Sequence, residues 1–408
     1  MTVITPTAEV EFQTQLFSVV EHLRGALTDL LGGIGADSAV PYAVSRQLGI
    51  NKNLSWKVCR IITTRDPFGA VEHLPGAQGV EILLDAAAEH GASDGSIEAV
   101  RSALLEFDRL VETHAGDRRT LDLMVASHHE APQAPIEESR RLAFEGNSTI
   151  WGVQGRARFA SFFIAPSVEG DGMVDCAVVG GLSEVRRMRP LVGVPLFQQQ
   201  AYNDDGTLRR PRRVPLDPDA SPDDPSMLIR SFCSPNAPPL EAQRMSDAIR
   251  FELPRGPVGR SGLATWVYGW RTLRLGSLYR DEVNHYGEHP TRVVVPVEAM
   301  QSDLYLHRSL PLHDHIRGAL YSQLAGQPYM GADQARDELP VRERVEPLGG
   351  RPPVSSTPLI PRYSEIVRYS FERLGWDANE FLGYRFVMNY PPIPTVFVMR
   401  YDLAERPA

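Results

Sequence analysis

The spacing of apolar residues changes once along this 408-residue chain, close to residue 150. Up to about residue 145, apolar residues recur every three or four positions in helix-sized segments that end at Gly, Pro or Asp. From about Ile150, short β-type runs bounded by Gly and Pro replace them. This order predicts an α+β protein, with an all-helical domain at residues 1–145 and a β-rich mixed domain at residues 146–408.

The boundaries of the expected elements follow from these patterns. The clearest helix is expected over Val10–Leu31, which ends at the pair Gly32 and Gly33. Further helices are expected over Ala77–His90, Ser96–Thr113 and Pro135–Phe144. Strands are expected at residues 157–165, 173–181, 191–197, 264–270, 291–297, 303–307, 384–390 and 394–403. The polar, Pro-rich segments 203–239 and 336–361 are expected to form long loops.

The acidic excess of the chain lies in its first part. The net charge is -9, and residues 1–145 hold 12 Lys plus Arg against 21 Asp plus Glu, whereas the remaining residues are balanced. Within this acidic part, the 25 residues Pro41–Arg65 contain five basic and no acidic residues. They include Lys52 and Lys57, the two lysines of the whole chain. A basic segment in an otherwise acidic domain indicates a negatively charged partner.

The basic segment is predicted to fold as two short helices, Ala43–Leu48 and Lys52–Ile62. Residues 49–51 would form the turn, and Asn51 is available to cap the second helix. Spacings of three and four then place one apolar side inward, formed by Ile50, Leu54, Val58, Ile61 and Ile62. The other side would expose Lys52, Asn53, Trp56 and Arg60, with Ser55 and Lys57 beside them.

This stretch resembles the helix-turn-helix of bacterial transcription regulators, with small Ser45, then Gly49, then apolar Ile50. The resemblance covers about 25 residues and implies binding to double-stranded DNA, with dimers on paired half-sites. It places in the major groove Lys52, Asn53, Ser55, Trp56 and Lys57, and on backbone phosphates Arg46, Arg60 and Arg65. Ser55 falls where the family usually has a buried aliphatic residue, unless Leu54 takes that role. The alternative is a basic hairpin whose cations are solvated or paired with neighbouring acids.

An aromatic run in the second part suggests a ligand site. Trp266, Tyr268 and Trp270 alternate along residues 264–270, so a strand would place all three on one face. Together with Arg274 they are the candidate residues for a small-molecule effector. The alternative, which the residue types favour, is that the three aromatic side chains form a core or a subunit interface.

Two further functions stay open from the sequence. Five histidines in one window could hold a metal ion of an enzyme in the β-rich domain, namely His285, His289, His307, His313 and His315. However, there is no H-E-x-x-H, Walker A loop, zinc-finger spacing or G-x-G-x-x-G after a strand, so the sequence predicts no cofactor. The G-x-S-x-G match at Ser93 lies in a helical context and is interpreted as a loop between helices. The third hypothesis is a non-catalytic scaffold for protein partners.

The sequence also bears on the cellular compartment. The first arginine is Arg24 and no apolar run approaches eighteen residues, so we expect neither a signal peptide nor a membrane span, and a cytoplasmic protein. Cys59, Cys176 and Cys233 form no C-x-x-C pair, so we expect reduced thiols.

Overall fold

A computed structural model of the protein describes residues 7–64, 66–126, 133–169, 172–190, 194–199, 212–221, 224–245, 248–282, 284–312, 316–324 and 334–406. The chain divides into two compact units, Met1–Ile136 and Glu137–Ala408. The first is helical and the second is rich in strands, so the fold class is α+β, as the sequence predicts. The division lies inside a helix, earlier in the chain than the expected boundary at residues 145–146.

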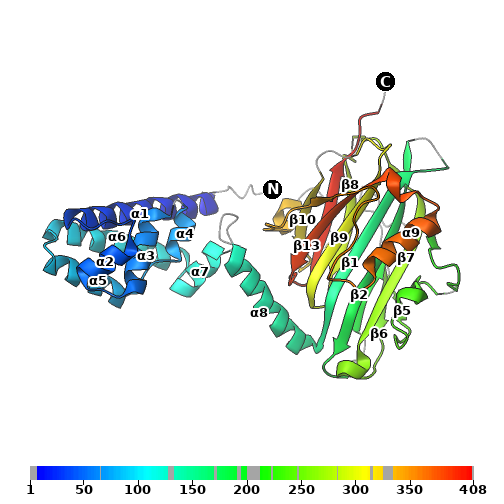
Figure 1. Ribbon diagram of the computed structural model, residues 1–408, viewed down its shortest axis with the longest axis horizontal. Coiled ribbons are helices and arrows are strands. Elements are labelled where there is room, and N and C mark those ends of the chain that lie inside the picture. Colours follow the sequence, from blue (N-terminus) through cyan, green and yellow to red (C-terminus); the bar gives the residue numbers. More distant parts are fainter. Residues whose placement is uncertain are drawn as a thin grey trace. The chain divides into compact units, whose positions relative to one another are not determined.

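The helical unit is built from seven helices in its described residues, and an eighth follows at the division (Figure 1). The helices are α1 (Thr7–Gly33), α2 (Pro41–Leu48), α3 (Lys52–Thr63), α4 (Pro67–Val71), α5 (Ala77–Glu89), α6 (Asp94–His114), α7 (Arg118–Ala126) and α8 (Gln133–Trp151). Ser93 is the N-cap of α6 and its side chain accepts a hydrogen bond from the Ser96 amide, which confirms that this residue lies in a loop between helices.

The long helix α1 packs along α6 inside its own chain. Its apolar side is almost fully buried, at Leu16, Val20, Leu23 and Leu27 for example, and joins one continuous core of the helical unit. A long amphipathic helix such as α1 can form either a core or a dimer seam with its apolar stripe. Because its side chains are already enclosed by the other helices, the stripe is not free to pair with a second copy.

The β-rich unit contains three sheets in its described residues. The largest has the order β12-β13-β9-β1-β2-β7-β4, in which β1 and β9 are parallel and all other pairs are antiparallel. Its strands are β1 (Val153–Pro166), β2 (Met173–Arg187), β4 (Arg213–Pro215), β7 (Ala264–Ser277), β9 (Val297–His307), β12 (Glu346–Leu348) and β13 (Phe381–Asn389).

Two smaller antiparallel sheets accompany the large one. The first has the order β11-β10-β14-β8 and the second β3-β6-β5. Their strands are β3 (Val194–Gln199), β5 (Glu241–Arg244), β6 (Ile249–Leu253), β8 (Tyr286–Val293), β10 (Arg317–Ser322), β11 (Glu338–Leu339) and β14 (Thr395–Asp402). Helix α9 (Tyr363–Leu374) and four short 3-10 helices complete the unit, at Arg230–Phe232, Gly259–Gly262, Gln334–Asp337 and Ala378–Glu380.

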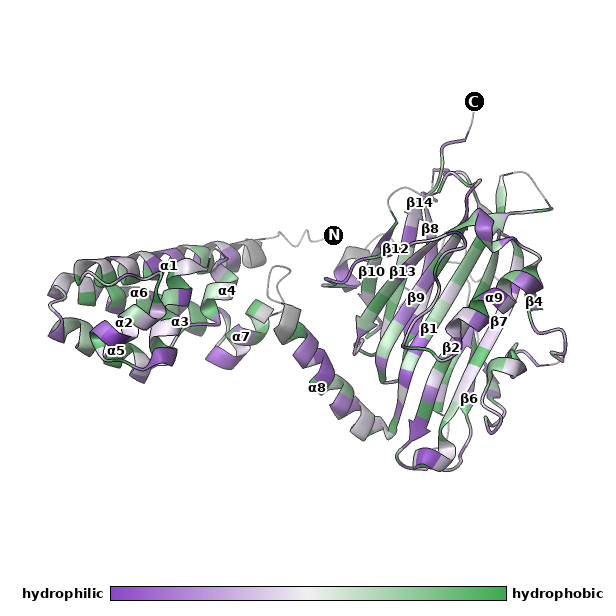
Figure 2. Ribbon diagram, in the orientation of Figure 1, coloured by the Kyte–Doolittle hydropathy of each residue, from purple (hydrophilic) through white to green (hydrophobic). Residues whose placement is uncertain are grey.

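The large sheet is covered on both faces. Helix α9 crosses one face, where Phe163, Tyr305 and Phe371 form part of a common apolar core (Figure 1). The two smaller sheets contribute Phe251 and Phe397 to a second core on the other face. Such coverage explains why the central strands read as nearly continuous apolar runs rather than as strict alternation. By contrast, α8 carries mostly hydrophilic residues (Figure 2).

Most of the expected elements agree with the structure. The helices expected over Val10–Leu31, Ala77–His90 and Ser96–Thr113 correspond to α1, α5 and α6, and α8 extends the expected Pro135–Phe144 in both directions. The expected strand 291–297 is wrong as one continuous strand, because residues 291–293 end β8 at Val293 and β9 begins only at Val297. Among the described residues, every helix is too short or too polar to cross a bilayer.

Candidate nucleic-acid interface

The basic segment folds as a helix, a tight turn and a second helix. Gly49 ends α2 with a backbone φ of 66°, a left-handed conformation in which glycine carries no Cβ penalty. The Asn51 side chain then caps α3 by accepting a hydrogen bond of 2.7 Å from the Asn53 amide. The expected turn at residues 49–51 and the expected cap are therefore both confirmed.

Several contacts hold the two helices in place against the helical core. The buried Ser45 hydroxyl donates to the Ile50 carbonyl at 2.8 Å and so ties α2 to the turn. Val58 and Ile61 are buried, and Leu54 and Ile62 pack partly buried against the same core. Arg24 of α1 donates to the Ile61 carbonyl at 3.0 Å, which places a cation at the C-terminal end of α3. The orientation of α3 is thus fixed by packing on its inner side.

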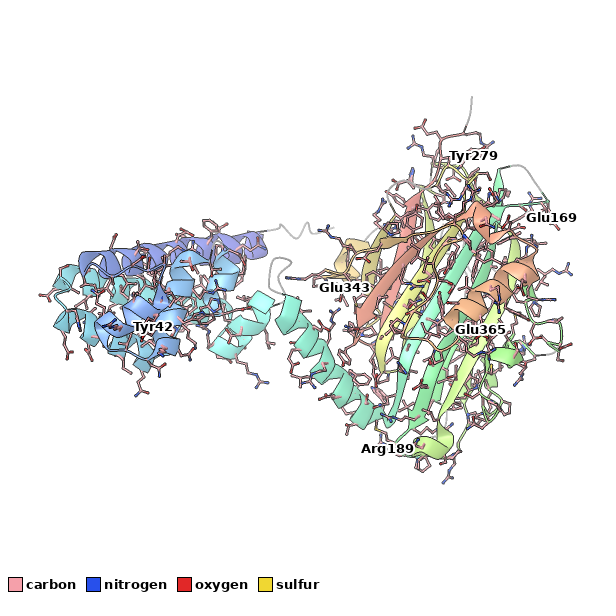
Figure 3. All side chains as sticks on the ribbon, in the orientation of Figure 1. Tyr42, Glu169, Arg189, Tyr279, Glu343 and Glu365 are labelled. Carbon is pink, nitrogen blue, oxygen red and sulfur yellow. The ribbon has the colours of Figure 1, made fainter. Side chains whose placement is uncertain are left out.

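The outer side of the two helices is basic and aromatic. Lys52, Asn53 and Arg60 are exposed, and the Trp56 side chain keeps 42% of its surface accessible. The Lys52 Nζ lies 5.3 Å from the centre of the Tyr42 ring, which is itself 63% exposed on α2 (Figure 3). We call the following set, whose members are exposed or partly exposed, the α2–α3 surface: Tyr42, Arg46, Lys52, Asn53, Trp56, Lys57 and Arg60.

The cations of this surface have no acidic partners in the described part of the chain. Elsewhere in the helical unit, arginines do pair with carboxylates, as in Arg101–Glu81 at 3.3 Å and Arg118–Asp122 at 2.9 Å. Within the described residues, no such ion pair involves Arg46, Lys52, Lys57 or Arg60. The alternative in which neighbouring acids neutralise these cations is therefore not supported, and their charge faces solvent.

Trp56 is held between two neighbours. The His73 ring meets the indole edge-on, with ring centres 5.1 Å apart, and the Arg60 guanidinium lies 5.5 Å from the indole centre. Burial, together with the positive charges of Arg60 and Lys57, lowers the pKa of His73 below its ordinary value of 6.5. His73 is therefore mainly neutral at pH 7.

Two of the expected DNA contacts, Ser55 and Arg65, are not members of the α2–α3 surface. Ser55 was expected to face the major groove, but it is fully buried and its hydroxyl donates to the Lys52 carbonyl at 3.0 Å. That expectation is wrong, because the inward position that the family usually fills with an aliphatic residue is taken by Ser55 itself. Arg65, expected on a phosphate, lies outside the described residues.

The aromatic strand is part of the core of the β-rich unit. Trp266, Tyr268 and Trp270 do share one face of β7, but they are 1%, 3% and 9% exposed. The Trp266 indole donates to the Pro238 carbonyl at 3.1 Å, and the Tyr268 ring stacks between those of Phe197 and Trp270. The ligand-site prediction for these three side chains is wrong, because the small sheet β3-β6-β5 fills the space beside them.

Arg274, the fourth candidate, is exposed near the end of β7. Its amide donates to the Asp175 carboxylate at 2.9 Å, and its backbone has a φ of 50°. Asp175 is fully buried and also accepts from Arg271 at 2.7 Å. This cluster fixes a bulge in the pairing of β2 with β7, so the contacts of Arg274 indicate a structural role.

The histidine window does not form a metal site in the described residues. His289 is buried between Phe162 and Tyr401, and burial lowers its pKa to about 3. His307 bonds Ser309 at 2.7 Å, and His285 is exposed beside Tyr286. The remaining two histidines of the window, His313 and His315, lie outside the described residues.

A buried polar network occupies the α9 side of the large sheet. The Asp303 carboxylate is fully buried and accepts two hydrogen bonds from Arg385, at 2.9 and 2.8 Å, and one from the Tyr363 hydroxyl at 2.6 Å. Burial and the charge of Asp303 raise the pKa of Tyr363. Arg385 also donates to the carbonyls of Ser355 and Ser356. The network joins β9, β13, α9 and a loop, which is a structural use of these groups.

The sequence did not single out Tyr42 or His73. Tyr42 lies one helical turn before Arg46 on α2, so helical spacing would have placed both on the same side. His73 follows α4 and reaches Trp56 only through the tertiary fold. No family model matches the chain, and no curated protein matches it either.

Proposed function

We propose that this protein binds double-stranded DNA through the α2–α3 surface and acts as a transcription regulator. The observation that carries the proposal is the group of four cations on one side of a helix-turn-helix, all of them without acidic partners in the described residues. In an acidic unit, unpaired cations on one side create a polar field that orients the approach of a polyanion. Phosphate oxygens would supply the missing counter-charges.

The side-chain types on the surface suit a duplex. Lys52, Lys57 and Arg60 can neutralise phosphates, and the Asn53 amide can bond the edge of an adenine in the major groove. A single α3 covers few base pairs, so we further propose that two copies bind adjacent half-sites. The β-rich unit would then serve oligomerisation or the sensing of an effector.

The test is a salt titration of DNA affinity with the full-length protein. The double variant Lys52→Ala, Lys57→Ala should bind duplex DNA more weakly, and the slope of log K against log salt should become shallower by about 1.8, since each lost phosphate contact removes about 0.9. Sedimentation of the same complexes would report whether two copies bind one duplex.

The matched control removes the same charge elsewhere in the helical unit. Arg109 and Arg119 are exposed on α6 and α7, so the double variant Arg109→Ala, Arg119→Ala has the same net charge as the lysine variant. We expect this control to keep the original slope. Equal losses in both double variants would mean that only net charge matters, and no DNA binding by the unmutated protein would remove the proposal.

A further inference from the structure

The exposed indole of Trp56 is the least ordinary feature of the α2–α3 surface. A large aromatic side chain that remains 42% exposed retains apolar area that a partner can cover. Its ring is already positioned by His73 and Arg60, so little conformational entropy would be lost when a partner binds it. Within the described part of the chain, the indole N–H has no hydrogen-bond partner.

Asn53 lies one turn before Trp56 on the same side of α3. Its backbone amide bonds Asn51, whereas its side-chain amide has no partner among the described residues. The two positions are separated by about 4.5 Å along the helix axis, from three residues at about 1.5 Å each. This separation is close to the rise of one base pair, about 3.4 Å. A helix in the major groove would therefore present Asn53 and Trp56 to neighbouring base pairs.

The bases that fit these two groups are adenine and thymine. An Asn side chain bonds the N6 and N7 atoms of adenine, and an apolar side chain contacts the C5-methyl group of thymine. Stacking of an unpaired base on Trp56 is less suited to the geometry, since on one side the base would have to displace the Arg60 guanidinium. The contact with a methyl group requires no such displacement when it uses the remaining exposed part of the ring.

Resting on the proposed DNA binding, we infer that Trp56 is a specificity-determining residue of this surface and contacts a thymine methyl group. The thymine would be adjacent to an adenine that Asn53 binds. Lys52 and Arg60, one turn before and after Trp56, would hold the flanking phosphates. The DNA site would then require an A·T pair that carries the thymine methyl group. This requirement is more specific than a general preference for DNA.

The experiment uses the full-length protein and duplexes selected from a random library. In the selected duplex, each thymine is replaced in turn by deoxyuridine, which lacks only the methyl group. We expect one position in each half-site at which affinity falls about fourfold, the amount that corresponds to one buried methyl-sized group. In the Trp56→Ala variant, the same replacement should have no further effect, as for a contact that has already been removed.

Tyr42→Ala is the matched control, since Tyr42 is a second exposed aromatic residue of the same surface. In Tyr42→Ala, the replacement of thymine by deoxyuridine should still lower the affinity about fourfold. If Trp56→Ala fails to fold by circular dichroism, Trp56→Phe replaces it and should show a smaller loss from the same replacement. No affinity for any duplex would overturn both the proposed function and this inference. A preference for single strands would likewise count against both. Duplex binding that no deoxyuridine replacement weakens, or an equal loss from that replacement in the Trp56 variants, would overturn the inference alone.

Discussion

The buried His289 should make the β-rich unit sensitive to acid. The ring lies in the core between Phe162 and Tyr401, and its Nε2 is 3.3 Å from the Tyr401 hydroxyl. Burial disfavours the protonated ring and lowers the pKa from 6.5 to about 3. In the unfolded chain the same ring takes up its proton near pH 6.5. Between these two values the unfolded state holds one more proton than the folded state.

The difference in bound protons sets the direction and the size of the pH effect on stability. The stability conferred by the neutral ring is fully present above about pH 6.5 and is lost as the pH falls toward 3. Each pH unit in that window costs about 1.4 kcal/mol, so the total loss approaches about 5 kcal/mol, and the interval from pH 6 to pH 4 accounts for about 2.5 kcal/mol. That is a large part of the stability of an ordinary domain.

Urea unfolding between pH 4 and pH 7, followed by tryptophan fluorescence, measures this loss. In a Trp56→Phe background the other four tryptophans of the chain, at positions 151, 266, 270 and 376, all belong to the β-rich unit, so the signal reports that unit alone. His289→Gln cannot titrate, and we expect its free energy of unfolding to fall about 2.5 kcal/mol less between pH 6 and pH 4. His285→Gln changes an exposed histidine four residues earlier and should keep the original pH dependence. The same pH dependence in His289→Gln as in the parent would refute the reasoning.

Two further predictions concern stability. Asn51→Ala removes the side-chain cap of α3, so the free energy of unfolding of the helical unit should fall by about 1 kcal/mol in thermal unfolding followed by far-UV circular dichroism, and an unchanged transition would contradict the cap. Asp303→Asn leaves the partly buried Arg385 cation without a carboxylate and should destabilise the β-rich unit by about 3 to 5 kcal/mol in urea. Tyr363→Phe removes the hydroxyl that bonds both Asp303 and Ser161 and should cost about 1 to 3 kcal/mol. Equal losses in these two variants would show that the ion pair is not the main interaction of Asp303.

The helix-turn-helix geometry was predictable because its signals are local. Gly49 and Asn51 act on their immediate neighbours, through a left-handed backbone and a side-chain cap, so the residue types alone indicate the turn and the start of α3. The apolar spacing then identified the inner side correctly, although it missed the buried Ser55 and Cys59. A small hydroxyl residue reads as exposed from its type, but here it bonds a carbonyl of its own helix and can be buried at little cost.

The pairing of strands was not predictable from the same patterns. Strand β9 follows β1 by well over a hundred residues and still lies beside it, in parallel, between β1 and β13. Alternation within a run shows that a strand is present and says nothing about its partner. Gly181 illustrates the information that only the fold supplies, since a Cβ there would lie 2.4 Å from the Trp266 carbonyl oxygen. The sequence shows a glycine in a strand, and the structure shows the close approach that requires it.

The same limit explains the opposite outcomes for the tryptophans. Trp266 and Trp270 were candidates for a ligand site and are core residues, whereas Trp56, which helical spacing placed on the outer side of its helix, is 42% exposed. Aromatic residues bury large apolar areas wherever the fold offers a cavity, so an exposed one indicates that no neighbour in its own unit covers it. On α3 this exposure coincides with unpaired cations and a side-chain amide that lacks a partner in the described residues. A solvated helix face accounts for the cations alone, but it gives no reason for an indole to be held in position among them. The proposed nucleic-acid partner would account for all three features together.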